Sequence, residues 1–438
     1  MRERDLRGAP RRHGVVLGSN PGLSGPDPRV ESSVPSRVGA LRDVVEVRCG
    51  DVHACALLRD GGVYCQGTNT EGRLGVGLAN LTRGPTRVAG VADVAQFALT
   101  ELAACARTTS GELWCWGTDD RFGDGRTPQR LVPTLAAGLG RVVDVVGRRE
   151  STCARSDDGV TRCWGRNWFG VLGDGAEGER WERVEVTVAP RGAVVSVGPN
   201  ASCARLTDGT ARCWGSNAWG MLGDGTSDSR PRAGPVIGLV DVAEVAVGAE
   251  HVCARLGDGQ VRCWGHNDAR QIGDGLESTA RPLPTSPYRI ANVSALAIGE
   301  RHTCVVSDGA VLCWGANSAG QVGVSPSASL ATPVSVPGLT GVVSLAAGSN
   351  HTCAVLEGGG VRCWGSNSAG QLGTPDGPSG PTPVAVPGID DAVEVRANNW
   401  STCARRSDGS LWCWGRGDSG LYGDGRCTAC RVPVPVAW

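Results

Sequence analysis

Pairs of cysteines that recur at a fixed interval constrain the fold of this chain more than any other feature. The first cysteine of a pair recurs at steps of 48 to 51 residues, and its partner follows ten residues later in seven pairs and nine residues later in one. The pairs are Cys55 and Cys65, Cys105 and Cys115, Cys153 and Cys163, Cys203 and Cys213, Cys253 and Cys263, Cys304 and Cys313, Cys353 and Cys363, and Cys403 and Cys413. Self-similarity at such a period is typical of repeat proteins. We therefore infer the architecture from the repeat and not from the usual number of domains in a chain of this length.

The segment between two paired cysteines predicts a β-hairpin. In the fourth copy, Asp208-Gly209 lies midway between Cys203 and Cys213, and an Asp-Gly step between β-prone residues favours a tight turn. A three-residue loop at 207–209 places the two cysteines opposite each other on neighbouring strands, where their Cβ atoms come close enough for a disulfide. We therefore expect each pair to form a disulfide within its own hairpin.

The pair with the shorter spacing supports the same interpretation. Cys304 and Cys313 are nine residues apart, and they flank Asp308-Gly309, which can form a two-residue turn. With that turn the two cysteines again face each other across the hairpin. A metal site or a chance distribution of cysteines would not predict this adjustment.

Each copy also contains four β-prone segments. In the seventh copy they cover residues 332–336, 342–347, 351–356 and 360–365, with Gly- and Pro-containing turns between them. Four strands in a copy of this length predict an all-β fold, a β-propeller of four-stranded blades. Eight copies predict eight blades, and seven blades are the alternative because the first copy has Gln66 where the others have tryptophan. We expect these tryptophans to pack between blades: Trp116, Trp164, Trp214, Trp264, Trp314, Trp364 and Trp414.

The two ends of the chain predict how the ring closes. Residues 1–36 have a turn-forming composition without periodicity and are expected to be disordered, which leaves a single propeller domain at 37–438. Residues 431–436 resemble the first segment of a copy, whereas the first copy begins at its second segment, so we expect the C-terminal strand to complete the N-terminal blade. Cys49 would then lie opposite Cys430 and form a disulfide with it, or with Cys427, and one of the 19 cysteines would remain unpaired.

Charge and cysteine content narrow the functional classes. The net charge of −1 provides no general attraction for nucleic acid, and no apolar run approaches the 18 residues of a membrane-spanning helix. The paired cysteines favour an oxidising compartment, so the protein is expected outside the cell or at its surface. The first 30 residues contain no segment with the pattern of a signal peptide, so the route of export is open.

Short segments that recur in the copies resemble the repeat of a known protein family. The segments 351–356, which reads His-Thr-Cys-Ala-Val-Leu, and 361–373, which contains Cys-Trp-Gly-Ser-Asn and Gly-Gln-Leu-Gly, are similar to the repeat of the regulator of chromosome condensation family. The likeness covers roughly residues 38–438 and implies a β-propeller, most often with seven blades. The paired cysteines and the extra copy depart from the family pattern. The founding member's nucleotide-exchange activity is not carried over, because the period leaves little room for its protruding wedge.

Three other recurring features invite functional interpretations. Gly-Asp-Gly tripeptides suggest calcium, but one Asp per blade supplies too few ligands, so we expect turns: Asp124, Asp174, Asp224, Asp274 and Asp424. Four histidines at one repeat position are too far apart to share a metal and are expected to form structural hydrogen bonds: His53, His251, His302 and His351. Four in-register arginines form a solvated stripe or a face for an acidic partner: Arg155, Arg205, Arg255 and Arg405.

Taken together, these features predict a monomeric propeller that binds an unidentified protein or a surface glycan, without catalysis, cofactor, metal or nucleic acid. The segments that vary most between copies, residues 175–190, 225–235 and 275–287, are the expected contact region. The alternatives are a nucleotide-exchange factor or cytoskeletal or cell-cycle regulator, which requires free thiols, and a propeller that binds or cleaves glycans.

Overall fold

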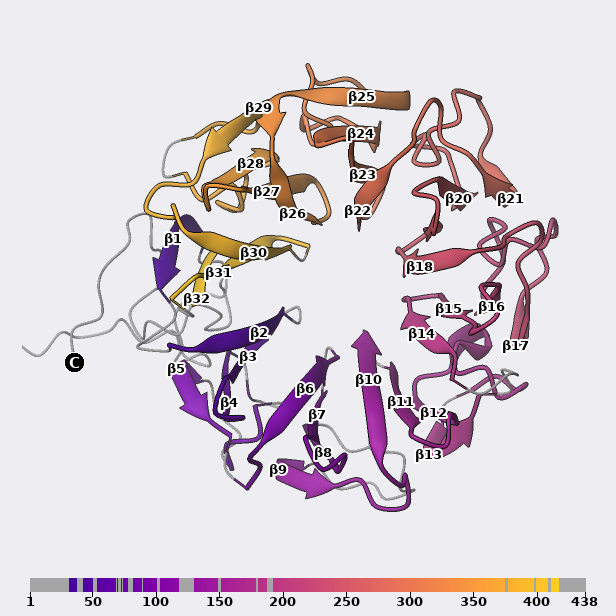
Figure 1. The fold of residues 1–438 in the computed structure, drawn as a ribbon, viewed down its shortest axis with the longest axis vertical. Helices are drawn as coiled ribbons and strands as arrows, with labels where there is room; N and C mark the ends of the chain where they lie inside the picture. The colour runs from indigo at the N-terminus through magenta and orange to yellow at the C-terminus, as the bar shows by residue number, and fades with distance from the viewer. Residues whose placement is uncertain are drawn as a thin grey trace, which may run out of the picture.

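The structure is a computed structural model of the 438-residue chain. It describes residues 31–37, 42–49, 53–67, 69, 72, 74–77, 82–88, 90–100, 103–117, 130–148, 151–178, 180–186, 192–374, 377–397, 399–408 and 411–416. Eight four-stranded antiparallel sheets surround a central axis, with one strand of each sheet near the axis and one at the rim (Figure 1). The prediction of an all-β propeller with eight blades is therefore confirmed, and seven blades are excluded.

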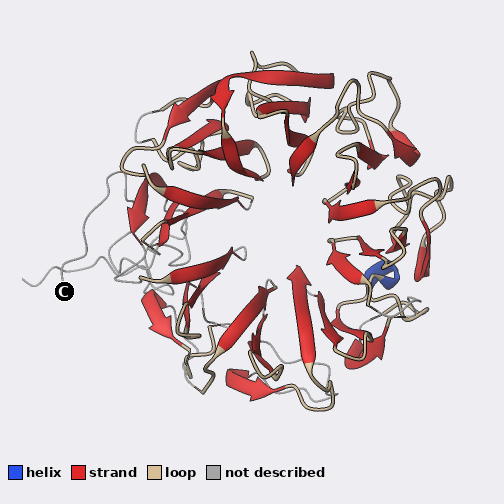
Figure 2. Ribbon diagram, in the orientation of Figure 1, coloured by secondary structure: helices blue, strands red, loops and turns tan. Residues whose placement is uncertain are grey.

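The strands follow the same order in each blade, from the axis to the rim. Blades 1 to 4 contain β2 (Val44–Cys49), β3 (His53–Leu58), β4 (Val63–Gly67) and β5 (Thr82–Arg87); β6 (Val94–Leu99), β7 (Ala103–Thr108), β8 (Leu113–Gly117) and β9 (Arg130–Leu135); β10 (Val142–Arg148), β11 (Ser151–Ser156), β12 (Thr161–Gly165) and β13 (Arg180–Glu185); and β14 (Val194–Val197), β15 (Ala201–Arg205), β16 (Ala211–Gly215) and β17 (Arg230–Pro235). Blades 5 to 7 contain β18 (Val242–Val247), β19 (His251–Leu256), β20 (Val261–His266) and β21 (Ala280–Thr285); β22 (Val293–Ile298), β23 (His302–Ser307), β24 (Ala310–Ala316) and β25 (Ser329–Thr340); and β26 (Val342–Ala347), β27 (His351–Leu356), β28 (Val361–Gly365) and β29 (Gly380–Ala385). Blade 8 contains β30 (Ala392–Ala397), β31 (Ser401–Arg406), β32 (Leu411–Arg416) and β1 (Glu31–Arg37), and a 3₁₀ turn, η2 (Trp168–Gly170), lies between β12 and β13 (Figure 2).

The ring closes at its last blade, and the expected closure was wrong. β1 pairs antiparallel with β32 and is therefore the rim strand of blade 8. Residues 31–36 of this strand were expected to be disordered. Blade 1 is complete without a C-terminal strand, because β5 pairs with β4. Residues 431–436 lie outside the described part of the chain, as do Cys427 and Cys430, so the disulfide to Cys49 stays a prediction.

The error came from the residue at which each copy of the repeat was taken to begin. The segment 332–336 was counted as the first strand of the seventh copy, but it belongs to β25, which pairs with β24 of the preceding blade through Cys313 and Val334. The rim strand is joined to the following blade by a short link and to its own sheet by a long loop, so proximity in sequence suggested the wrong partner. The correct signal was present: Val-Pro-Ser-Arg at 34–37 resembles Gly-Pro-Thr-Arg at 84–87 of β5.

The cysteine hairpins form as the spacing predicts. Seven disulfides join the second and third strands of blades 1 to 7, with Cα atoms 4.1 to 4.2 Å apart. Cys403 of blade 8 is also disulfide-bonded, and its partner in the ladder is Cys413. In the short hairpin, Asp308 and Gly309 have φ angles of 50° and 78°, which is the two-residue turn predicted there.

Removing one of these hairpin disulfides should lower the free energy of unfolding by a measurable amount. Replacing Cys203 and Cys213 with alanine is expected to decrease the free energy of unfolding by about 3 kcal/mol, because the unfolded chain loses the closure of its ten-residue loop. Urea denaturation followed by tryptophan fluorescence measures the change. The same substitution of Cys304 and Cys313 is the matched control and should give a similar loss, whereas an unchanged urea midpoint in both variants would contradict the prediction.

The tryptophans lie at the interfaces between blades. All seven are fully buried. Five of them donate their indole N–H to a backbone carbonyl of the preceding blade at 2.7 to 3.0 Å: Trp214 to Val171, Trp264 to Met221, Trp314 to Gln271, Trp364 to Gln321 and Trp414 to Gln371. Their expected role in packing between blades is therefore what the structure shows.

Buried histidines extend this contact in one half of the ring. The Thr303 hydroxyl of blade 6 donates to the Gln271 carbonyl of blade 5 at 3.1 Å, and the same hydroxyl lies 2.9 Å from Nε2 of His251. Because the hydroxyl gives its only proton to the carbonyl, it accepts from the histidine N–H. The same network joins blades 6 and 7 through His302 and Thr352, and blades 7 and 8 through His351 and Thr402. These three histidines are thus structural; the side chain of His53 lies outside the described residues.

Candidate functional site

Each blade presents two sets of connections, one on each face of the ring. The links between the first and second strands and between the third and fourth strands emerge on one face, which we name the loop face. The hairpin turns and the links between blades emerge on the opposite face. Because the links between the third and fourth strands are the longest, the loop face offers the larger variable surface.

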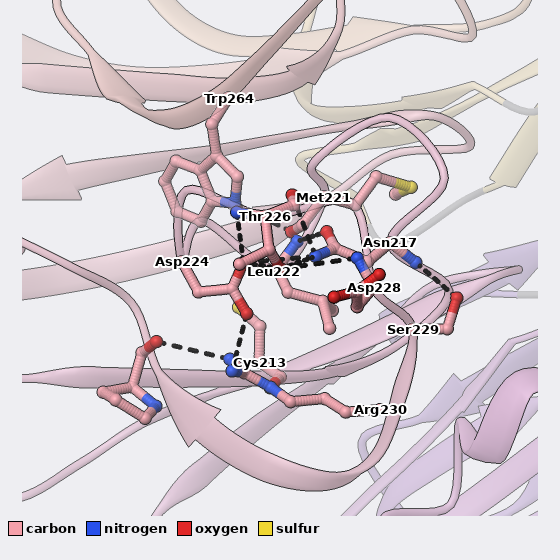
Figure 3. Close-up of polar contacts among 11 residues, drawn as sticks. Cys213, Asn217, Met221, Leu222, Asp224, Thr226, Asp228, Ser229, Arg230 and Trp264 are labelled. Carbon is pink, nitrogen blue, oxygen red and sulfur yellow. Dashed lines mark hydrogen bonds and ion pairs between the residues drawn. The ribbon is translucent and has the colours of Figure 1, made fainter.

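The long loop of blade 4 is held by a side-chain network around Asn217. Its Oδ1 accepts from the Leu222 amide at 2.9 Å, and its Nδ2 donates to Asp224 at 3.1 Å (Figure 3). The other carboxylate oxygen of Asp224 accepts from Arg230 at 2.7 Å. Burial raises the pKa of Asp224, but the hydrogen bonds from Thr226 and Asn217 and the charge of Arg230 outweigh it and hold the pKa below 3.8. The loop is consequently rigid before any partner arrives.

The Gly-Asp-Gly tripeptides act in turns, as predicted. Asp224 accepts from the Thr226 amide at 3.0 Å, and Asp174 and Asp274 accept from the amide two residues later in the same way. Asp124 and Asp424 lie outside the described residues. Within the described ranges, no group of three or more His, Cys, Asp or Glu side chains is placed to hold a metal ion.

The expected contact segments are positioned differently from the prediction. Residues 175–190, 225–235 and 275–287 contain the rim strands β13, β17 and β21, so six residues of each segment belong to a strand. Prolines in β17 and β21 suggested loops, but an edge strand tolerates proline because its outer N–H groups need no partner. The variable surface of blades 3 to 5 is therefore made by the residues just before these strands.

Three exposed aromatic side chains stand on that surface. Trp168 and Phe169 of blade 3 and Trp219 of blade 4 are 53%, 45% and 42% exposed, and we name them the aromatic row. Phe169 and Trp219 follow the loop asparagine by two residues, a position that holds Ala269 in blade 5, where it is buried. Sequence reasoning missed the row, although its signal was a departure from the small residues found in other copies.

The backbone beneath the row is fixed by contacts with the next blade. Phe169 adopts a φ of 57°, a left-handed conformation that is rare for a side chain of this size. The adjacent Gly170 has a φ of 74°, and a Cβ there would collide with Pro231 of β17. Gly220 meets Pro282 of β21 in the same way. Each turn is thus wedged against the rim strand of its neighbour, which keeps the aromatic side chains on the surface.

Polar side chains support both ends of the row. The guanidinium of Arg166 lies 3.4 Å from the ring centre of Trp168. Trp219 stacks on His266 with ring centres 4.3 Å apart, and Nδ1 of His266 lies 2.7 Å from Glu250 while Nε2 lies 3.5 Å from Asp268. Both nitrogens of His266 therefore face carboxylates, which does not match the pairing of a histidine base with a hydroxyl or thiol nucleophile.

An ion pair links this support to blade 6. Asp268 contacts Arg301, and the pair lies between the loops of blades 5 and 6. Partial burial raises the pKa of Asp268, but the hydrogen bond from Arg301 and the charges of His266 and Arg301 outweigh it, so the pKa is lowered. The hydrogen bond to Asp268 in turn raises the pKa of Arg301. The site therefore spans four consecutive blades.

Three of the four arginines in the stripe are paired with acids, whereas Arg205 lies opposite Val194 in the ladder. Arg155, Arg255 and Arg405 lie 3.7, 3.4 and 3.1 Å from Asp144, Glu244 and Glu394 on the neighbouring inner strands. These contacts favour the solvated, structural interpretation over a face for an acidic partner.

Comparisons with known proteins agree with the repeat. Models of the regulator of chromosome condensation repeat match residues 44–73, 194–218, 242–271, 293–321, 342–371 and 392–421, and, in a second form, 208–255 and 308–355. The described part of the chain contains no helix of the length and apolarity that crossing a membrane requires.

Solved structures show the same fold at low identity. Prp20p from Saccharomyces cerevisiae, described with its binding to Gsp1p and histones, is 19% identical with a TM-score of 0.60, over 82% of this chain and 92% of that chain. Human WBSCR16 is 20% identical with a TM-score of 0.63, over 82% and 99%. A probable E3 ubiquitin-protein ligase, HERC6 from Homo sapiens, is 43% identical over 65 residues, which is 14% of this chain and only 6% of the ligase.

Proposed function

Because this chain is built from repeats of the regulator of chromosome condensation family, we propose that it is a non-catalytic scaffold, secreted or exposed at the cell surface, that binds a partner protein through the loop face of blades 3 to 5. The observation that carries the proposal is the aromatic row, three large apolar side chains held on a fixed backbone. The scaffold is a single propeller domain, and the disulfides of its hairpins suit an oxidising environment.

The composition of the site is that of a protein-binding surface. Tryptophan and arginine are enriched among the residues that dominate binding energy, and these residues cluster at the centre of an interface. Trp168, Trp219 and Arg301 are of these types, and charged side chains surround them. Since the loops are already ordered by their own hydrogen bonds, binding costs little conformational entropy.

Removing the row should weaken binding strongly without loss of the fold. We expect Trp168→Ala, Phe169→Ala and Trp219→Ala together to reduce capture of partners from the surrounding fluid or neighbouring cells at least about 30-fold, because a single such residue contributes about 2 kcal/mol or more. The measurement is affinity capture by the immobilised protein, followed by quantitation of each captured protein.

The control variant carries three substitutions on the opposite face. Ile237→Ala, Val240→Ala and Tyr288→Ala remove apolar side chains of similar exposure from the links between blades. Capture should survive in this control. Equal loss in both variants, or no loss in either, would show that the row is not the contact surface.

Thiol counting under denaturing conditions tests the location. A secreted propeller with formed hairpin disulfides should expose few free thiols, whereas an intracellular exchange factor or cytoskeletal regulator should expose nearly all of its 19. Exposed tryptophans also stack on sugars, so glycan binding is the second candidate; binding of the wild type to a glycan array, lost in the row variant, would favour it.

A further inference from the structure

We infer that the partner presents an arginine or lysine side chain to Trp219, at the blade 5 end of the aromatic row. This inference rests on the proposed function and adds the chemistry of the partner. It is carried by three observations: an unequal balance of charge on the loop face, the way Trp219 is stacked, and the difference between the two ends of the row.

The loops of blades 4 to 6 carry more acid than base. Four acids in this region already have an arginine partner: Asp224 with Arg230, Asp268 with Arg301, Asp274 with Arg281, and Glu277 with Arg270. The remaining carboxylates are Asp228, Glu250 and Glu300, and only Glu250 has a side-chain contact among the described ones, with His266. Against these three acids, Arg232 of β17 is exposed and has no acid partner among the described contacts. The loop surface of blades 4 to 6 therefore carries an excess of negative charge, which favours a positively charged partner.

The stacking of Trp219 leaves a place for a cation. His266 covers one side of the indole, and the residue remains 42% exposed. A cation over the face of a tryptophan is favourable, and tryptophan is the best of the aromatic side chains for this contact.

The two ends of the row differ in the side chain that lies over the tryptophan ring. Trp168 already has a cation from its own chain, since Arg166 lies over its ring at 3.4 Å. Trp219 has no arginine over its ring among the described contacts, and the nearby Arg301 is engaged by Asp268. Trp168 is thus covered by an arginine of its own chain, and Trp219 by a histidine that faces two carboxylates, so the row can orient a partner whose basic group is placed at the Trp219 end.

Fluorescence anisotropy with three synthetic peptides tests this inference. The peptides contain four repeats of Ser-Leu-X, with X as Arg, Gln or Glu, so that only charge differs between them. We expect the Arg peptide to bind about tenfold or more tightly than the Gln peptide, and the Glu peptide more weakly than either, as for complementary charged surfaces. The preference should also weaken as salt is raised, because exposed charges are screened.

Two variants locate the preference. Asp228→Asn, Glu250→Gln and Glu300→Gln together should remove it, and Asp228→Asn with Glu300→Gln should remove part of it while the Glu250 contact with His266 remains. The matched control is Asp157→Asn, Asp258→Asn and Glu357→Gln, which changes net charge equally on the hairpin turns of the opposite face. The control should keep the full preference.

The outcomes separate this inference from the proposed function. Equal binding of the three peptides, or equal loss of preference in the control, overturns the inference. If partner capture still requires the aromatic row in that case, the proposed function stands. If neither the peptides nor the captured partner require the row, both fail.

Discussion

Acidification will destabilise this propeller steeply below about pH 6, because three histidines of the described part of the chain, His251, His302 and His351, are completely buried. Burial lowers the pKa of His251 to about 3, with smaller contributions from the charges of His302 and His266, and burial lowers those of His302 and His351 to about 4 and about 3. In the unfolded chain these rings take up protons near pH 6.5, but in the folded protein they do not. The unfolded state therefore binds more protons, and stability is lost as the pH falls from about 6.5 towards 4.

The expected slope is large because the three histidines act together. Each proton contributes about 1.4 kcal/mol per pH unit, so the free energy of unfolding should fall by about 4 kcal/mol per pH unit near pH 5. Urea denaturation at a series of pH values measures the slope. His251→Gln, His302→Gln and His351→Gln together should remove most of it, and each single variant about a third; a triple variant with the wild-type slope would refute the explanation.

The histidines also predict where the ring opens first. Blades 5 to 8 are joined through them, whereas the corresponding position in blade 4 is Ala201. Hydrogen exchange at pH 5 should therefore rise earlier in β23, β27 and β31 than in β15. Carboxylates such as Asp224, whose pKa is lowered, contribute only at more acidic pH, because their stabilisation is lost below about 4.

Replacing one interface tryptophan will have the largest effect of any single substitution. Trp314→Ala is expected to reduce the free energy of unfolding by about 3 to 5 kcal/mol, because it empties a fully buried site between blades 5 and 6. It also removes the donor that lies 2.8 Å from the Gln271 carbonyl. Urea denaturation at pH 7.5 measures the loss.

An exposed tryptophan provides the matched control. Trp219→Ala changes the same residue type on the loop face and should alter stability by less than about 1 kcal/mol, since substitutions at exposed positions are usually small in effect. Comparable losses in the two variants would show that burial between blades does not govern stability. A small loss for Trp314→Ala alone would show that the interface can collapse around the cavity.

The hairpins and the number of blades could be predicted because their signals are local. The positions of Cys203, Asp208-Gly209 and Cys213 determine strand pairing within a few residues, and the period determines the count. Ring closure could not be predicted in the same way. Two segments, 31–37 and 431–436, resemble a rim strand, and the choice between them depends on the sheet to which a strand bonds and not on its distance in sequence.

The contact region expected from the sequence stays a prediction, and it can be compared only with the proposed site. The contact segments fell on blades 3 to 5, where the structure places the aromatic row, but the segments themselves included β13, β17 and β21. Trp168 and Trp219 were not predicted as surface residues, because a tryptophan in a repeat is most often a core residue. Whether such a side chain is exposed depends on the conformation of the turn that carries it. The histidines were expected only to form structural hydrogen bonds. Their threonine partners lie about 50 residues away in the sequence and become neighbours only when the blades form a ring.

The described disulfides all lie within single blades, and this locality has a mechanical consequence. None of the described disulfides ties one blade to another, so a force that separates two of the described blades meets a noncovalent interface. Stretched between a bead and a surface, the molecule should lengthen in steps as blades release one at a time. Each step should be shorter by the residues enclosed between two cysteines, and a reductant should restore that missing length.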